Sequence, residues 1–128
     1  MIISIIVPGP MSDARRFLPL KPVDLVILLA LLEEERHGYA LAREIESRTD
    51  GLVHLEPGNL YRVIRRLEDD GLIAESGRRP AADRDDERRR YYRITPLGAD
   101  AAALEARRLR ALLATPAVRT RLLRPEPV

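Results

Sequence analysis

The sequence predicts a mainly α-helical fold with one small β-hairpin. Apolar residues recur at helical spacing in four segments between residues 22 and 114. Only two short segments, 72–76 and 90–95, have the composition of strands, and a polar stretch separates them. With 128 residues and a mass of 14.5 kDa, the chain is expected to form a single domain.

The first two helices are predicted at residues 22–36 and 39–48. Pro22 suits the first turn of a helix. Leucines follow at positions 25, 28, 29 and 32 with further apolar residues between them, so we expect this helix to be buried nearly all round. His37-Gly38 breaks it, and the second helix turns Leu41 and Ile45 inward. A turn at residues 49–51 ends the second helix.

The third helix is predicted from Pro57 to Asp69 or Asp70, with Gly71 as its C-cap. At 100° per residue its apolar side chains fall within one narrow arc, and its polar side chains spread over the opposite side. The polar side consists of Asn59, Arg62, Arg65 and Arg66. We therefore expect one face to pack and the other to carry charge.

The predicted hairpin follows, with a long mobile loop at residues 77–89. A last helix is expected from Pro96 to about Ala114, with Thr95 as its cap. Its apolar stripe includes Ala101, Leu104, Ala111 and Leu112, interrupted by Arg108. An exposed stripe of this kind needs a cover, so these four residues are the predicted dimer interface. The alternative is that the helix folds back on its own three-helix core.

The predicted domain plan has four parts. Residues 1–20 form a flexible N-terminal segment, with the true start possible at Met11, and residues 21–95 form a winged helix-turn-helix. Residues 96–115 form the dimerisation helix, and residues 116–128 form a loose tail. Three helices followed by a hairpin predict the winged helix, because one helix can enter the major groove while the hairpin reaches the backbone or the minor groove.

The charge distribution agrees with a DNA-binding surface. The 22 basic and 20 acidic residues give a formal net charge of +2, and 21 of the 22 are arginines. Residues 33–50 hold six acids and three arginines, a net −3, whereas residues 78–93 hold seven arginines and four acids, a net +3. The small total therefore conceals a polarised chain.

Four motifs resemble those of the PadR-type transcriptional regulators. They are His37-Gly38-Tyr39, Leu55-Glu56-Pro57-Gly58-Asn59-Leu60-Tyr61, Leu67-Glu68-Asp69-Asp70-Gly71-Leu72-Ile73 and Arg90-Tyr91-Tyr92-Arg93-Ile94-Thr95-Pro96-Leu97-Gly98. The resemblance covers about residues 22–114. It implies a homodimeric repressor that binds a pseudo-palindromic DNA operator, with the last helix joining the subunits. Relatives that respond to small molecules make an effector possible, although none is identified here.

The candidate DNA contacts lie on the second and third helices and in the wing. They are Tyr39, Asn59, Tyr61, Arg62, Arg65, Arg66, Arg88, Arg89 and Arg90. Arginine matches both a phosphate and the edge of guanine. Each residue also has a structural alternative: the arginines could pair with nearby acids, Asn59 could cap the third helix, and the tyrosines could pack against the core.

Several functional classes are excluded or disfavoured. The chain has no cysteine, its two histidines stand 17 residues apart, and no apolar run approaches the roughly 18 residues of a membrane span. No arrangement of serine, histidine and carboxylate suggests catalysis. We expect a cytoplasmic protein that is not an enzyme and has no metal or cofactor. The alternative function is a winged-helix protein-interaction module without specific DNA binding.

Overall fold

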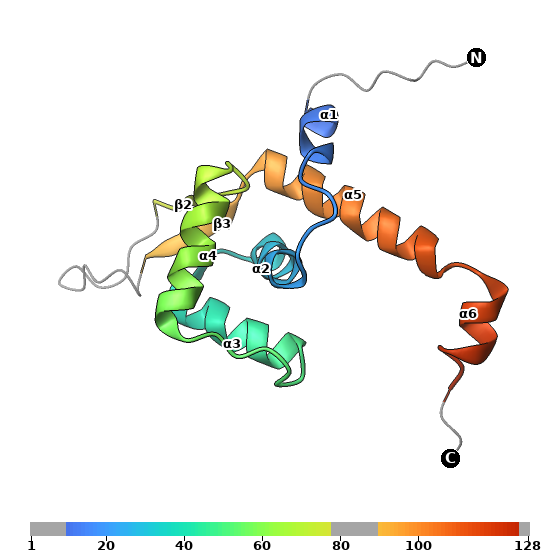
Figure 1. Cartoon of the computed structure of the whole chain (residues 1–128). Helices are drawn as coiled ribbons and strands as arrows, with labels where there is room; N and C mark the ends of the chain where they lie inside the picture. Colours follow the sequence, from blue (N-terminus) through green and yellow to red (C-terminus); the bar gives the residue numbers. More distant parts are fainter. Residues whose placement is uncertain (1–9, 78–89, 126–128) are drawn as a thin grey trace.

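The computed structural model describes residues 10–77 and 90–125 and confirms the mainly helical fold with a small antiparallel sheet (Figure 1). The elements are α1 (Pro10–Arg15), α2 (Pro22–Glu33), β1 (Arg36–His37), α3 (Gly38–Arg48), α4 (Pro57–Asp69), β2 (Ile73–Glu75), β3 (Tyr91–Ile94), α5 (Pro96–Leu113) and α6 (Pro116–Arg121). Residues 78–89, where a loop was expected, lie outside the described residues.

The sheet has three strands in the order β1-β3-β2, all antiparallel. Ile73 pairs with Ile94 and Glu75 with Tyr92, which is the predicted hairpin. The prediction missed β1, in which Arg36 pairs with Tyr92. Two residues are too few to produce an alternating pattern, so no sequence pattern predicted this strand.

The core lies where α2, α3 and α4 meet the sheet. Leu41 and Ile45 of α3 and Ile64 of α4 are at most 1% exposed, as their spacing predicted. The expectation that α2 is buried nearly all round was wrong at Leu32, which is 57% exposed. It lies in the last turn of α2, next to the exposed Glu33 and Glu34, where the chain leaves the core.

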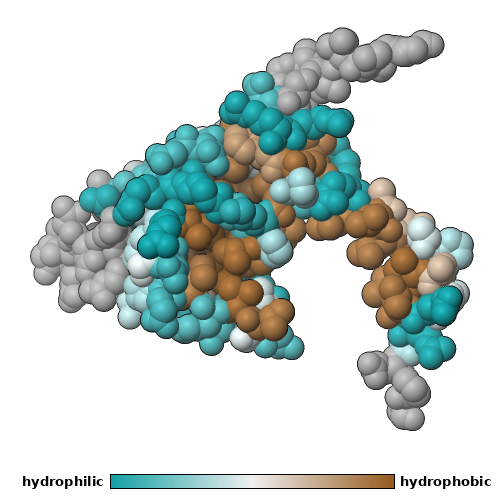
Figure 2. Space-filling model, in the orientation of Figure 1, coloured by the Kyte–Doolittle hydropathy of each residue, from teal (hydrophilic) through white to brown (hydrophobic). Residues whose placement is uncertain are grey.

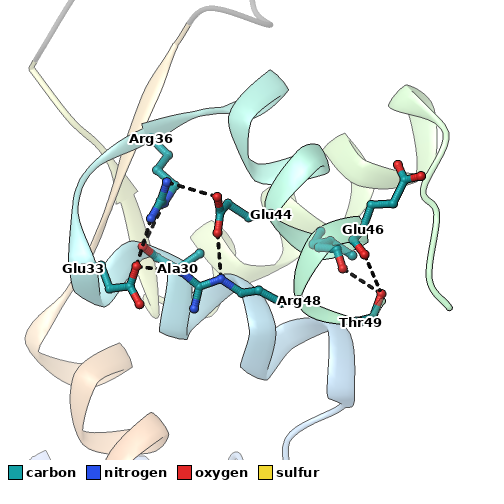
Figure 3. A network of polar contacts seen from close by, with 8 residues as sticks. Ala30, Glu33, Arg36, Glu44, Glu46, Arg48 and Thr49 are labelled. Atoms are coloured by element: carbon teal, nitrogen blue, oxygen red, sulfur yellow. Dashed lines mark hydrogen bonds and ion pairs between the residues drawn. The ribbon is translucent and has the colours of Figure 1, made fainter. Parts of the chain in front are cut away.

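A closed ring of ion pairs joins the end of α2 to α3 (Figure 3). Arg36 donates to the carbonyl of Ala30 at 3.0 Å and to Glu33 at 3.2 Å, and it pairs with Glu44 at 3.5 Å. Arg48 binds both glutamates, each at 2.7 Å. Arg48 lowers the pKa of Glu33 through this hydrogen bond. The ring orients α3 relative to α2, although its exposed members contribute little to stability one by one.

The two ends of the chain differ from the predicted domain plan. Residues 1–20 were expected to be flexible, but α1 packs along α5 and buries Ala14 completely. The backbone N–H of Leu20 donates to Glu105 at 3.1 Å, and Arg108 donates to both oxygens of Glu105 at 2.6 and 3.0 Å. This 2% exposed carboxylate therefore fastens the N-terminal segment to α5. Part of the predicted loose tail forms α6, capped by Thr115.

Candidate nucleic-acid interface

The outer face of α4 is the centre of the candidate site. Pro57 occupies the first turn of α4, and Gly71, with a φ of 80°, lets the chain turn after its end. Leu60, Ile64 and Leu67 face the core and are buried. The opposite side leaves Gly58, Asn59, Arg62, Arg65 and Asp69 exposed. The two faces of this helix are those that the sequence predicted, except that Arg66 is not on the exposed side.

Arg62 and Arg65 are the exposed cations of this face. Both side chains are exposed, and within residues 10–77 and 90–125 neither forms an ion pair. Their guanidinium groups are therefore available to a ligand in solution. A guanidinium binds phosphate or guanine in a bidentate manner, and both are chemical groups that double-stranded DNA presents.

Arg66 behaves differently because it lies on the flank of α4 that faces α2. Its two terminal nitrogens donate to the two carboxylate oxygens of Asp24 at 2.8 and 3.0 Å. The side chain of Asp24 is only 6% exposed, whereas that of Arg66 is 39% exposed. The hydrogen bond to Asp24 raises the pKa of Arg66. The ion pair turns Arg66 toward its own chain, and its partner is 42 residues away along the chain and not one of the nearby acids.

The two candidate tyrosines have different surroundings. Tyr61 packs beside Gly38, where a Cβ atom would lie only 2.5 Å from the Tyr61 hydroxyl oxygen, so the contact between α3 and α4 depends on a glycine. Tyr61 is half-buried, while Tyr39 at the start of α3 is 56% exposed. Both line a cavity of about 230 Å³ between the two helices. Tyr39 is therefore the better placed to reach a ligand.

Asn59 does not cap α4. The N-cap position is Glu56, and its side chain makes no cap hydrogen bond. Asn59 lies in the first turn with an exposed side chain. The structure therefore contradicts the alternative in which Asn59 caps the helix, and the predicted DNA contact of Asn59 stays a prediction.

The wing is described only at its base. Arg88 and Arg89 lie outside the described residues, so those two predictions have no structural counterpart. The guanidinium of Arg90 lies 3.9 Å from Glu75, and its Nε is buried without a hydrogen-bond partner among the described residues. Burial raises the pKa of the neighbouring Glu68, with Glu75 and Asp69 adding to the shift.

The turn between α3 and α4 contains a feature that the sequence analysis did not identify. His54 lies between two carboxylates, with Nδ1 3.2 Å from Glu46 and Nε2 3.4 Å from Glu56. The hydrogen bond to Glu46 raises the pKa of His54. Glu46 is eight residues away along the chain, a spacing that carries no helical or strand signal.

The predicted dimer interface divides into two halves. Ala101 is fully buried against its own chain, so its assignment to a dimer interface was wrong. The reason is that α1 and α2 cover this half of α5. Leu104 is half-buried and packs against the same core.

The second half of α5 projects past the body (Figure 1). There Ala111 is exposed and Leu112 is 62% exposed. Figure 2 shows apolar surface continuing along this part of α5 into α6. The prediction missed three further exposed leucines, Leu113, Leu122 and Leu123. An apolar run in the supposed loose tail was the available signal for the last two.

Two kinds of site are absent from the part of the chain that the structure describes. It contains no group of three or more acidic, histidine or cysteine side chains that could hold a metal ion. It also contains no helix that is long and apolar enough to cross a membrane.

Comparison with known proteins gives consistent results. The model of the transcriptional regulator PadR-like family matches residues 27–104. The chain is 36% identical over 90 residues to transcriptional regulator Rv3488 of Mycobacterium tuberculosis, covering 70% of this chain and 78% of that protein. Over 76 residues it is 38% identical to uncharacterized protein X of Lysinibacillus sphaericus, covering 59% and 67%.

Solved structures show the same likeness. A transcriptional regulator from Clostridium thermocellum has a TM-score of 0.57 and 27% identity, covering 84% of this chain and 91% of that one. The structure of H. salinarum RosR has a TM-score of 0.63 and 27% identity, covering 84% and 90%. The family match includes α3, α4 and the wing strands but ends within α5, so α1 and α6 lie outside it.

Proposed function

Because this chain belongs to the PadR-like family of transcriptional regulators, we propose that it is a homodimeric repressor that binds a pseudo-palindromic DNA operator. In this proposal α4 enters the major groove, α3 crosses the backbone at its N-terminus, and the wing lies beside them. Each subunit reads one half-site.

The observation that carries the proposal is the outer face of α4. Arg62 and Arg65 are exposed on it without an ion-pair partner among the described residues, and Asn59 lies about one turn before Arg62. Arginine can read guanine and asparagine can read adenine in the major groove. We assign Arg62, Arg65 and Asn59 to base or phosphate contacts, Tyr39 to a phosphate, and Arg88, Arg89 and Arg90 to the wing's contacts. Arg66 and Tyr61 then support the helix that makes these contacts.

A mobility-shift titration with the gene's own upstream region tests the proposal. We expect a specific complex whose affinity falls steeply with salt, because arginines displace counterions from the phosphates. Arg62→Ala and Arg65→Ala are expected to weaken binding about tenfold or more each, which corresponds to about 1.4 kcal/mol or more. Arg15→Ala, which removes the same charge from an exposed position in α1, is the matched control. No preference for the upstream region over random DNA at moderate salt contradicts the proposal.

The proposed dimer uses the projecting half of α5 together with α6. Its exposed apolar residues are Ala111, Leu112, Leu113, Leu122 and Leu123. Contiguous apolar surface of this kind usually marks a protein–protein contact, and a two-fold dimer matches the two half-sites of an operator. Light scattering is expected to give a dimer for the wild type and a monomer for Leu112→Glu. A wild-type monomer at tens of micromolar contradicts this assignment.

The cavity between α3 and α4 is the candidate place for a small-molecule effector. Its walls include Tyr39, Ala42 and Tyr61. A ligand bound there would alter the contact between the two helices.

The charge-reversed double variant Arg62→Glu with Arg65→Glu separates the proposal from a protein-interaction module. Loss of operator binding in this variant supports repression through DNA. If the wild type binds only an acidic protein and never DNA, the module is favoured.

A further inference from the structure

A second basic surface lies beside the outer face of α4, in a groove between α4 and the start of α2. The groove has a volume of about 490 Å³. Its cations are Lys21, Arg62 and Arg66, and its other lining residues are Pro22, Val23, Asp24, Val53, Leu55 and Val63. None of the sequence motifs pointed to Lys21, although it is the only lysine of the chain.

The groove carries a net positive charge that its own residues do not neutralise. Among the described residues Asp24 is the one acid in its lining, and both oxygens of that carboxylate accept hydrogen bonds from Arg66. Lys21 is exposed, and among the described residues neither Lys21 nor Arg62 has an ion-pair partner. Two cations therefore remain for an anion in solution.

The floor of the groove is apolar. Val23, Val53, Leu55 and Val63 are half-buried and pack against the core, so the floor is fixed in shape. The buried carboxylate of Asp24 holds Arg66 at one wall in a bidentate ion pair, which keeps that wall in place. A strand of nucleic acid has the matching chemistry, since it alternates anionic phosphates with the less polar faces of its sugars.

The position of Arg62 links this groove to the proposed site. Arg62 lies both on the outer face of α4 and in the lining of the groove. A duplex that receives α4 in its major groove has a backbone strand on each side of that helix. One of these strands passes the Arg62 side of α4, where Lys21 also lies.

We propose that the groove lined by Lys21, Arg62 and Arg66 holds the DNA sugar-phosphate backbone beside the major groove that α4 enters, with Lys21 and Arg62 on phosphates and the Asp24–Arg66 ion pair fixing one wall. The inference rests on the proposed function, which it deepens by adding a contact at the start of α2. Phosphate contacts fix the orientation of a protein on DNA without reading the sequence. Lys21 would thus set the angle at which α4 lies in the major groove of the DNA.

The first test is the salt dependence of operator binding by Lys21→Ala. We expect weaker binding to operator and to random DNA in the same ratio. The slope of log K against log salt should fall by about one for each lysine lost, hence about two for a dimer. Lys21→Arg should restore the slope, because it keeps the charge. Arg15→Ala is the charge-matched control and should leave the slope unchanged.

The single lysine allows a second, independent test. An amine-directed reagent labels Lys21 and the N-terminal amine, which digestion places on different peptides. We expect operator DNA to slow the labelling of Lys21 in the wild-type protein. Equal labelling rates with and without DNA, in a sample that binds operator, would overturn this inference and leave the proposed function standing.

The tests also separate DNA from another occupant. Decanoate is an anion with a long apolar tail. If decanoate protects Lys21 from labelling while operator DNA does not, the groove binds small amphiphiles and the inference is wrong. If the wild type binds no DNA at all, the proposed function itself fails. A slope that Lys21→Ala leaves unchanged, with normal circular dichroism, refutes the contact directly.

Discussion

Replacing Arg66 with methionine should destabilise the protein more than a surface substitution does. The change leaves Asp24 without the two hydrogen bonds of 2.8 and 3.0 Å that it now receives. Breaking a fully buried ion pair costs about 3–5 kcal/mol, because one charge stays buried without a partner. Water reaches this pair from one side, since Arg66 is 39% exposed, so we expect a loss of about 2–4 kcal/mol after allowing for that screening.

A double-mutant cycle measured by urea unfolding isolates the pair. Asp24→Asn removes the charge and keeps the shape, and we expect it to cost about 1–2 kcal/mol. In Asp24→Asn with Arg66→Met no charge is left stranded, so the combined loss should fall short of the sum by at least ~1 kcal/mol. The dependence of stability on urea should keep its slope if the fold is unchanged.

Arg65→Met is the matched control, since it makes the same substitution on the same helix at an exposed position without an ion pair among the described residues. Its expected effect is within about 0.5 kcal/mol. The reasoning is refuted if Arg66→Met costs no more than Arg65→Met, or if the two changes in the cycle are additive. Either result would mean that water already screens Asp24.

Three further predictions concern other parts of the fold. Gly98→Ala places a Cβ against the backbone of Leu72, which cannot move aside, so unfolding free energy should fall by about 1–3 kcal/mol or more in urea titrations. His54→Gln should flatten the pH dependence of stability, because the pKa of His54 is raised in the folded protein. The stability from this shift is fully present below the pKa of His54 in the unfolded chain, and it is lost as pH rises through the pKa in the folded protein. Glu105→Ala should release the N-terminal segment, which faster hydrogen exchange at residues 10–20 would reveal.

Gly58→Ala adds a Cβ where nothing lies within 4 Å, and it should not destabilise the protein; equal losses at both glycines contradict the packing argument. The His54 effect should shrink in high salt, because its partners are exposed. For Glu105, unchanged exchange at residues 10–20 shows that apolar packing alone holds α1.

Glu105 adds an acid-side prediction of opposite sign. Its hydrogen bond to Arg108 lowers the pKa of the folded carboxyl group. A lowered pKa contributes stability above the unfolded pKa, and this contribution is lost as pH falls through the folded value. Stability measured by thermal unfolding should therefore decline less steeply in acid for Glu105→Gln than for the wild type.

The sequence by itself determined four helices, α2 to α5, and the apolar and polar faces of α4. Prolines begin α2, α4 and α5, and the 3.6-residue period of apolar side chains is a local property that needs no knowledge of the fold. The motifs around Gly38, Pro57 and Tyr91 also sufficed to indicate the family, which the comparisons confirmed. The exposure of Arg62 and Arg65 was predictable for the same reason, since both lie opposite the apolar arc of α4; their DNA contacts stay a prediction.

Only the tertiary structure decided which residues meet across the chain. Arg66 and Asp24 are 42 residues apart and Leu20 and Glu105 are 85 apart, so neither pair leaves a local pattern. Ala101 was predicted as an interface residue because the periodicity of α5 shows that one face is apolar but does not show what covers that face. The groove beside Lys21 likewise exists only because folding brings the start of α2 next to α4.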